Sequence, residues 1–502
     1  YISMKPKTFR RLHKWIGLGF CAFLIAFCVS GIVLNHRNAF SDFGLSRRYL
    51  PELFRYKDWN QGLLRGTLRV GDSVFIYGNS GIWSADTLGQ KVADANVGLP
   101  HGIDHRNIRA LAQTGDGQLW AMGQFGLYRR SAPHDAWQSV ILPAGDERYS
   151  DLTLRGDSLV VVGRSFLYVA RPPYRRFERI TLPKAIDDDG RISLFRTVWH
   201  LHSGAIFGLP GQLFMDAVAV LLIVLSFTGV LHFLFPHWLK RLRTSSRRRF
   251  VARLFGQNLR FHDWMGRKTI VILLFVVLTG WSLRPPLLLA LVNLSTPPIP
   301  FSTLDSDNPW HDRLRMLRYD DQMGDWLLST SSGFYAFKDF HELPVPIDNA
   351  PPVSVMGLNV FEREADGHWL IGSFNGFYRW QRQMNASADY MTGEPVVRPS
   401  RMPFGQLAVG GFSSDFRNAD GTPRPIVVSH YGGTDRLKQP ESMRHLPMSL
   451  WNVALELHNG RLYTFLIEPS LFYIFLAGIL CLLILWTGWK VRRRSRHVGV
   501  QS

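Results

Sequence analysis

The sequence predicts a membrane protein in which transmembrane α-helices are combined with all-β outer segments. Three observations predict this fold class. Four apolar stretches approach the roughly 20 residues that a bilayer-spanning helix needs. The formal net charge of +19 is concentrated beside these stretches. The long segments between them carry glycine-bearing patterns that are typical of β-hairpins.

The four apolar stretches run from Trp15 to Leu34, Gly211 to Phe235, Met265 to Leu283 and Ser470 to Trp489. Basic residues gather before the first, between the second and third, and after the fourth, and these segments carry +5, +9 and +5. Cytoplasmic loops of membrane proteins show such an excess of Lys and Arg. We therefore expect a bacterial inner-membrane protein with both termini cytoplasmic and the large loops periplasmic. A nucleic-acid partner, which a basic chain also suggests, is not expected.

This topology divides the chain into eight segments. They are a cytoplasmic N-terminus with the first helix (1–36), a periplasmic β domain (37–204), the second helix (205–236), a basic cytoplasmic loop (237–262), the third helix (263–294), a second periplasmic β domain (295–461), the fourth helix (462–489) and a basic cytoplasmic tail (490–502).

The two halves of the chain are copies of one unit. The motif from Leu12 to Gly17 returns from Phe261 to Gly266, and each copy reaches a later glycine, Gly31 or Gly280, at the same distance from its histidine. The motif from His202 to Gly204 corresponds in the same way to the segment from His458 to Gly460, and the helices that follow end in Thr-Gly at 228 and 487. A duplicated helix, outer domain and helix predicts a four-helix bundle with a pseudo-twofold axis along the membrane normal.

The outer segments contain internal repeats of their own. Hairpin patterns recur at Tyr77–Trp83, Gly117–Tyr128 and Gly156–Tyr168, then at Gly324–Tyr335 and Asp366–Tyr378, with a weaker one at Ile426–Gly433. Their spacing of about 40 to 45 residues matches a four-stranded propeller blade. We predict one shared propeller of about six blades. Two separate small β domains are the alternative.

Histidines gather at both ends of the predicted bundle, where ionisable groups are costly and usually functional. A neutral imidazole is a strong axial ligand of haem iron, and a four-helix bundle can hold a porphyrin between facing helices. Repeat symmetry places His13 level with His262 and His202 level with His458. Two other readings are histidines that only anchor helix ends, and a zinc or copper site. A compact His/Cys/carboxylate cluster, which zinc or copper prefers, is absent from the sequence pattern.

Two further histidines, His36 and His232, break the symmetry and are alternate ligands. His36 follows His13 by 23 residues, about 34 Å of helix, so one helix reaches both faces. His232 lies 30 residues beyond His202, which is too far for one straight span, and a break at Gly208–Gly211 resolves this. Arg37 and Arg284, at the outer helix ends, are candidate partners of haem propionates or of lipid headgroups.

The motifs resemble those of the PepSY-associated transmembrane proteins. The resemblance rests on Leu12–Gly17 and its variant Phe261–Gly266, on His202–Gly211, on His458–Gly460 and on Thr-Gly at 228 and 487. It is strongest toward the inner-membrane ferric-siderophore reductases, which carry two b-type haems. The resemblance implies His13, His262, His202 and His458 as haem ligands, with His36 and His232 as alternates. The outer segments depart from that family, because they show propeller-like hairpins and no PepSY domain.

The resulting hypothesis is a haem-dependent electron conduit through the lipid bilayer. It would take electrons from a cytoplasmic donor or a quinol and reduce a periplasmic ferric siderophore. The sequence shows no catalytic dyad, triad or nucleotide-binding loop, which fits a protein whose chemistry belongs to its cofactor. The alternatives are a non-redox membrane sensor or assembly factor whose β domain binds a ligand, and a metal or siderophore permease.

Overall fold

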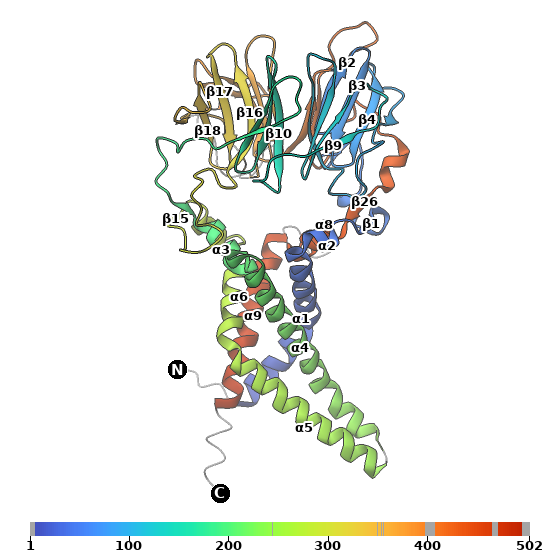
Figure 1. The fold of residues 1–502 in the computed structure, drawn as a ribbon. Helices are drawn as coiled ribbons and strands as arrows, with labels where there is room; N and C mark the ends of the chain where they lie inside the picture. Colours follow the sequence, from blue (N-terminus) through green and yellow to red (C-terminus); the bar gives the residue numbers. More distant parts are fainter. Residues whose placement is uncertain are drawn as a thin grey trace. The chain divides into compact units, whose positions relative to one another are not determined.

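A computed structural model describes residues 6–242, 244–348, 350–352, 354, 356–396, 407–463 and 470–493. The chain forms two compact units, shown in Figure 1. Unit 1 consists of residues 1–40, 190–305 and 450–502, and unit 2 consists of residues 41–189 and 306–449. Each unit therefore draws on both halves of the sequence repeat.

Unit 1 is helical. Its helices are α1 (Pro6–Asn35), α2 (Arg37–Phe40), α3 (Leu194–Ser203), η3 (Ala205–Phe207), α4 (Gly208–Arg241), α5 (Ser245–Lys268), α6 (Ile270–Ser282), α7 (Leu287–Leu291), α8 (Leu450–His458) and α9 (Ser470–Arg493). A short strand pair, β14 (Ile192–Ser193) and β15 (Ser295–Thr296), joins the segments before α3 and after α7.

Three segments within the described residues are long and apolar enough to cross a membrane, namely Lys7–Asn35, Ala205–Arg241 and Tyr473–Val491. They coincide with the first, second and fourth predicted spans. The third predicted span is met only in part. Helices α5 and α6 are together long and apolar enough to cross a membrane, but they are bent by 63° relative to each other. The first half of α5 is rich in arginine, and the 13 residues of α6 cover only about 20 Å. The third predicted span and the four-helix bundle therefore remain predictions.

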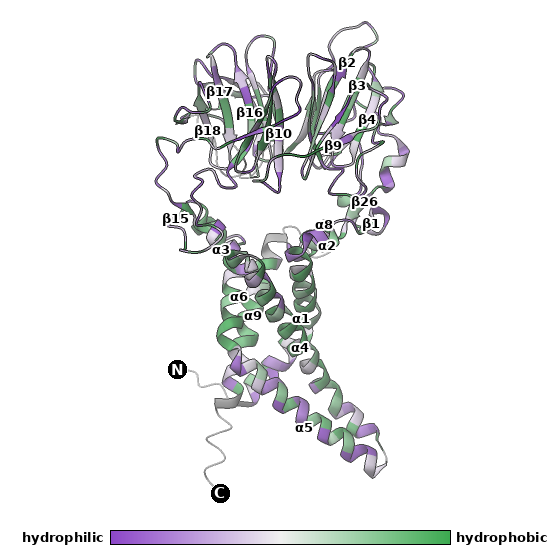
Figure 2. Cartoon of the chain, in the orientation of Figure 1, coloured by the Kyte–Doolittle hydropathy of each residue, from purple (hydrophilic) through white to green (hydrophobic). Residues whose placement is uncertain are grey.

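The long helices pack side by side. Helix α1 contacts α4, α8 and α9, α4 contacts α5, and α6 contacts α3 and α9. The buried core between them is small and includes Cys28, Val218, Leu222 and Leu273. Figure 2 shows α1, α4, α6 and α9 as largely hydrophobic. Apolar side chains that face outward on helices of this length are what a bilayer requires.

A break before the second span is present, but it lies at residues 204–207, and the predicted Gly208–Gly211 forms the first turn of α4. Helix α3 ends at Gly204, which has a left-handed φ of 77°, and a Cβ at this position would lie 2.1 Å from the backbone oxygen of Gly211. Gly208 then starts α4 with φ 62°. Only glycine allows such a close backbone approach in this conformation. The corresponding Glu468-Pro469 lies outside the described residues.

Unit 2 is built of β-strands. The strands are β1 (Gly44–Ser46), β2 (Gly66–Val70), β3 (Ser73–Gly78), β4 (Gly81–Asp86), β5 (Ala93–Asp94), β6 (Ile108–Gln113), β7 (Leu119–Gly123), β8 (Leu127–Arg130), β9 (Gln138–Val140), β10 (Tyr149–Arg155), β11 (Ser158–Gly163), β12 (Leu167–Ala170), β13 (Glu178–Ile180), β16 (Leu314–Asp320), β17 (Asp325–Thr330), β18 (Phe334–Phe337), β19 (Val345–Pro346), β20 (Val360–Arg363), β21 (Trp369–Ser373), β22 (Gly376–Gln381), β23 (Ala386–Asp389), β24 (Val409–Ser413), β25 (Ile426–Ser429) and β26 (Pro447–Ser449).

These strands form small antiparallel sheets in chain order. The four-stranded sheets are β2–β5, β6–β9, β10–β13, β16–β19 and β20–β23, and β24 pairs with β25. Each strong hairpin pattern of the sequence falls on the second and third strands of one of these sheets, and the weak pattern falls on β25. The predicted hairpins are thereby confirmed. Strand β1 pairs with β26, which joins the two ends of the unit.

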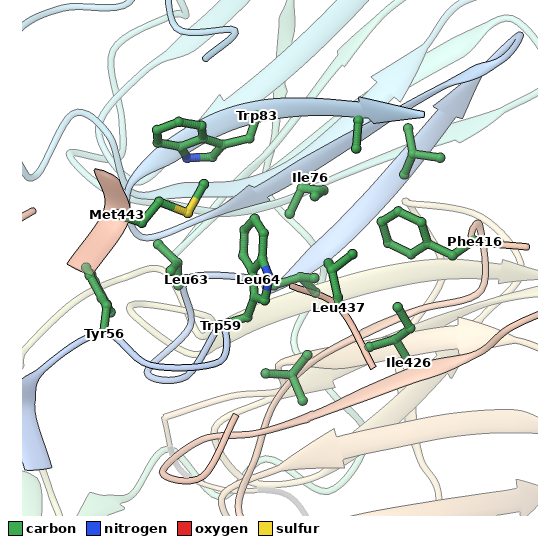
Figure 3. Close-up of a cluster of buried hydrophobic side chains, with 13 residues drawn as sticks. Tyr56, Trp59, Leu63, Leu64, Ile76, Trp83, Phe416, Ile426, Leu437 and Met443 are labelled. Atoms are coloured by element: carbon green, nitrogen blue, oxygen red, sulfur yellow. The ribbon is translucent and has the colours of Figure 1, made fainter. Parts of the chain in front are cut away.

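Consecutive sheets pack face to face through aromatic and aliphatic side chains. Strand β6 contacts β2 and β10, β10 contacts β16, and β24 contacts both β20 and β2. The cluster in Figure 3 spans the ends of the unit, because Trp59, Leu63 and Trp83 pack with Phe416 and Met443. The outer segments of both halves thus share one core. Closure of the sheets into a propeller remains a prediction.

Candidate functional site: two histidine layers

The first histidine layer joins α1 and α5. The imidazole rings of His13 and His262 lie with their centroids 6.3 Å apart and their planes at 68°. Both residues belong to unit 1 and stand at equivalent positions of the repeated motif. The structure therefore brings together the pair that repeat symmetry placed at one level.

The second layer joins α3 and α8. The rings of His202 and His458 also have centroids 6.3 Å apart, with an interplanar angle of 48°. Each of these histidines occupies the last turn of a short helix that precedes a long one. The left-handed glycine that follows each helix, Gly204 or Gly460, ends it two residues after the histidine.

All four rings are held in the same way, by a hydroxyl from a neighbouring helix. In each case Nδ1 contacts the side-chain oxygen of a Ser or Thr that directly precedes a glycine. The pairs are His13 with Thr487 (3.3 Å), His262 with Thr228 (2.9 Å), His202 with Thr279 (3.2 Å) and His458 with Ser30 (3.0 Å).

These hydroxyls determine which ring nitrogen carries the proton. A hydroxyl has one proton, and each of the four donates it to a carbonyl oxygen of its own helix three or four residues earlier. The hydroxyl must then accept from Nδ1. Nδ1 of His13 also contacts the carbonyl oxygen of Ile484, and Nδ1 of His458 contacts the carbonyl oxygen of Phe27. Because a carbonyl oxygen can only accept, Nδ1 must donate in both contacts. The rings are therefore Nδ1–H tautomers whose Nε2 lone pair is available to a metal.

A glycine lies against each ring, directly after the hydroxyl residue. A Cβ atom at Gly280 would lie 2.6 Å from Cε1 of His202, and one at Gly488 would lie 3.0 Å from Cε1 of His13. At Gly31 and Gly229 the corresponding distance to His458 and His262 is 3.6 Å. The missing side chains at Gly280 and Gly488 thus leave room for the imidazoles of His202 and His13.

The alternate ligand His36 is not part of either layer. Its Nε2 lies 2.6 Å from a carboxylate oxygen of Asp216 on α4, and Asn35 donates to the other oxygen of that carboxylate at 2.9 Å. The contact of the His36 Nε2 with Asp216 therefore connects the chain just after α1 to α4.

The alternate ligand His232 stacks on Phe255 of α5, with ring centroids 5.0 Å apart. Of the two arginines, Arg37 lies over the ring of Trp451 at 4.0 Å. Arg284 interacts electrostatically with Glu456 and Arg461. The structure thus brings four of the predicted histidines into two pairs. His36 contacts Asp216 instead, whereas His232 lies beside the first pair and interacts electrostatically with His13 and His262.

Among the described residues, one group has the composition of a small cation site. Ligand atoms of Glu364, Asp366 and His368 in unit 2 lie within 4.8 Å of one another. The guanidinium of Arg379 donates to both carboxylates. Because Arg379 already forms ion pairs with both carboxylates, this group is explained as an ion-pair network on the β20–β23 sheet.

Unit 2 also buries charged groups on the first strands of its sheets. Asp151 on β10 is fully buried, and it accepts from Arg318 Nη1 on β16 at 2.5 Å and from the backbone N–H of Leu317 at 2.9 Å. Burial, reinforced by the carboxylate of Asp415, raises the pKa of Glu362 on β20 to about 7. The ion pair between Asp151 and Arg318 connects the β10–β13 sheet with the β16–β19 sheet.

Sequence reasoning found the four histidines but missed the groups that orient them. The signal was present, because Ser-Gly or Thr-Gly stands at 30, 228, 279 and 487 in all four apolar stretches. Thr-Gly was noticed at only two of these positions, and as a helix ending. Asp216 was missed because a single carboxylate within an apolar run has no periodic signature.

The fold and the site define a class: a membrane protein with paired histidine layers in a helical unit and an all-β second unit. The chain belongs to the family of the PepSY-associated TM region, whose model matches residues 10–492. The resemblance to this family is thus confirmed. A search of curated proteins found no match.

Solved structures offer only distant likenesses. One is the extracellular domain of a one-component system from B. thetaiotaomicron, at 11% identity and a TM-score of 0.34, covering 76% of this chain and 33% of the other. Another is PorZ, a surface component of the type-IX secretion system of Porphyromonas gingivalis, at 9% identity and a TM-score of 0.23, covering 72% and 44%. The chain spans less than half of either protein, and such TM-scores do not identify a fold.

Proposed function

We propose that unit 1 binds two b-type haems and conducts electrons across the membrane to an acceptor in the periplasm, a ferric siderophore. His13 and His262 would hold one haem, and His202 and His458 the other. When bound, haem iron cycles between Fe(III) and Fe(II) and so passes one electron at a time. Iron reduction releases the metal from a siderophore because Fe(II) binds hard oxygen chelators weakly.

The observation that carries this proposal is the common spacing of the two ring pairs. Two imidazoles on opposite sides of one metal ion, each with a metal–nitrogen bond of about 2 Å and a ring centre about 1 Å beyond the nitrogen, have centroids about 6 Å apart. Both pairs have 6.3 Å. The spacing of each pair therefore leaves room for one metal ion between the two rings, where a haem iron would be held.

The residues around the rings support the same reading. The hydroxyls fix the Nδ1–H tautomer and the ring orientation, as the outer-shell partners of metal-binding histidines do. The glycines keep the space beside each ring free of side chains. The four ligands come from four different helices, which is how cofactor sites in helical bundles are built.

The two layers stand far apart along α1. His13 contributes to one layer, and Ser30, 17 residues later, orients His458 in the other. This separation corresponds to about 25 Å of helix, close to the thickness of the hydrocarbon core. A site at each end of one long helix is the arrangement that electron transfer between two membrane faces needs.

For unit 2 we propose a propeller of about six blades that lies in the periplasm. The chain-order contacts between its four-stranded sheets, and the contact of β24 with β2, support a closed ring. Sheets of four antiparallel strands are the unit of that architecture.

Reoxidation kinetics test this function. The purified protein is reduced with dithionite under anaerobic conditions, excess reductant is removed, and ferric siderophore is added while the haem absorption is followed. We expect rapid reoxidation by the ferric complex and none by the same siderophore loaded with gallium, which has the same charge but is not reduced. Equal traces with iron and gallium would exclude siderophore reduction and point to a different electron acceptor, whereas a non-redox sensor would show no haem absorption to follow.

A further inference from the structure

Helix α5 contacts the membrane span α4 with one face and leaves two other faces, one apolar and one rich in arginine, exposed. Its inner face is defined by residues that contact α4 and its side chains. Phe255 stacks on His232, Asn258 donates to the backbone oxygen of Thr228 at 2.9 Å, and His262 contacts the Thr228 hydroxyl. These positions are three and four residues apart, so they lie on one face.

A second face of α5 is apolar and uncovered. Phe250, Leu254, Phe261 and Trp264 follow helical spacing and are 61%, 37%, 41% and 57% exposed. They form one stripe because residues separated by 4, 11 or 14 positions share a helix face. Figure 2 shows hydrophobic and hydrophilic positions interleaved along α5, in contrast to the apolar α6.

A third face of α5 carries a stripe of arginines beside the apolar stripe. Arg249, Arg253 and Arg260 each directly precede a member of the apolar stripe and are exposed. Their own spacing is again that of one helix face. Apolar side chains flanked by guanidinium groups are the pattern of a helix that lies in a membrane interface.

The bend between α5 and α6 indicates what covers these stripes. The two helices meet at Thr269 at 63°, so α5 leaves the direction of the apolar α6. A helix that turns away from a membrane span meets the headgroup layer first. Arginine binds phosphate by two parallel hydrogen bonds, and anionic headgroups complement the net positive charge of α5.

We propose that α5 is an interfacial helix whose apolar stripe inserts among the lipids and whose arginine stripe binds anionic phospholipid headgroups. The surface that α5 contacts is the bilayer leaflet on the side of the His13–His262 layer. Because α5 carries His262, headgroup binding holds that ligand at a fixed depth. The proposal holds whether or not the layers bind haem.

Site-directed spin labelling tests this assignment. A single cysteine replaces Phe250 in a variant whose native cysteines Cys21, Cys28 and Cys481 are changed to Ala, and a matched control carries Ala252→Cys on another face of α5. The labelled full-length proteins are placed in nanodiscs of phosphatidylcholine alone or with phosphatidylglycerol. Collision with oxygen reports lipid burial, and collision with a water-soluble nickel chelate reports exposure. Size-exclusion chromatography, which does not depend on haem, checks that each variant is folded.

We expect the label at 250 to favour oxygen in anionic nanodiscs and the label at 252 to favour the nickel chelate. Arg249→Gln, Arg253→Gln and Arg260→Gln together should shift the label at 250 toward the chelate. Chelate access at 250 in both kinds of nanodisc would overturn the interfacial placement. Equal burial in neutral and anionic nanodiscs, unchanged by the triple substitution, would overturn the headgroup assignment.

Discussion

At the scale of single residues, the histidine layers depend on the hydroxyls that orient them. Each ring has Nδ1 at 2.9 to 3.3 Å from a Ser or Thr oxygen. The hydroxyl proton is already donated to a helix carbonyl, so the ring must donate. This arrangement gives the Ser or Thr before the glycine in each apolar stretch a role: it selects the tautomer that leaves Nε2 free.

Removal of one hydroxyl should weaken haem binding in one layer. In Thr228→Val the side chain keeps its shape but no longer accepts from His262 Nδ1. We expect a loss of affinity of about 10- to 100-fold for the haem of that layer, measured by titrating haem into haem-depleted protein. Thr228→Ser restores the hydroxyl and should restore affinity. A Val variant that binds as tightly as wild type would contradict the assigned role.

The glycines offer a second test at this scale. Gly280→Ala places a methyl group 2.6 Å from Cε1 of His202, whereas Gly229→Ala places one 3.6 Å from Cε1 of His262, an ordinary contact. We expect the first variant to lose one haem and the second to retain both, as judged by haem content per chain. The opposite ranking would show that the ring positions are wrong.

At the scale of elements, the structure distinguishes paired histidines from the alternates. His36 at the end of α1 is committed to Asp216 of α4, so its Nε2 is not available to a metal. We expect His36→Ala to keep both haems, while His13→Ala or His262→Ala loses the haem of one layer and His458→Ala that of the other. Optical and electron paramagnetic resonance spectra of the variants measure this. Loss of a haem in His36→Ala would reinstate it as a ligand.

Unit 2 provides a prediction of pH dependence through Glu362. Its pKa is raised from 4.5 to about 7 by burial, so in this pH range the folded chain holds a proton that the unfolded chain has lost. The free energy of unfolding therefore falls as the pH rises. A glutamine has no such proton, so Glu362→Gln should gain on the order of 2 kcal/mol relative to wild type between pH 5 and pH 8.

Thermal unfolding of the full-length protein at the two pH values measures this difference. The exposed Glu52→Gln serves as the control and should show the pH dependence of wild type. The result that argues against a buried, protonated Glu362 is a constant difference between the Gln variant and wild type across the range.

Many of the helices and hairpins were predictable from the sequence because they depend on local patterns. Membrane spans and hairpins are local patterns, and the hairpins at 117–128 and 366–378 fall on the strand pairs β7–β8 and β21–β22. The bend at Thr269 was missed, because a hydropathy window does not report direction. The pairing of β1 with β26 was missed as well, since about 400 residues separate the strands and no local period encodes contacts between distant segments.

At the scale of the whole molecule, duplication explains both units. Helices of both halves combine in unit 1, and sheets of both halves combine in unit 2. The two histidine layers follow from this, because each equivalent pair of repeat positions meets across the helical unit. The repeat predicted which histidines lie at the same level, but it settled neither which rings pair nor which hydroxyls hold them, since those contacts join non-equivalent helices.

The visible absorption spectrum of the purified full-length protein tests the central claim most directly. Two layers of paired histidines predict a Soret band that shifts on reduction with dithionite, low-spin spectra of six-coordinate haem, and a haem content that approaches two per chain. Absence of a Soret band from protein purified out of haem-replete membranes would contradict the account.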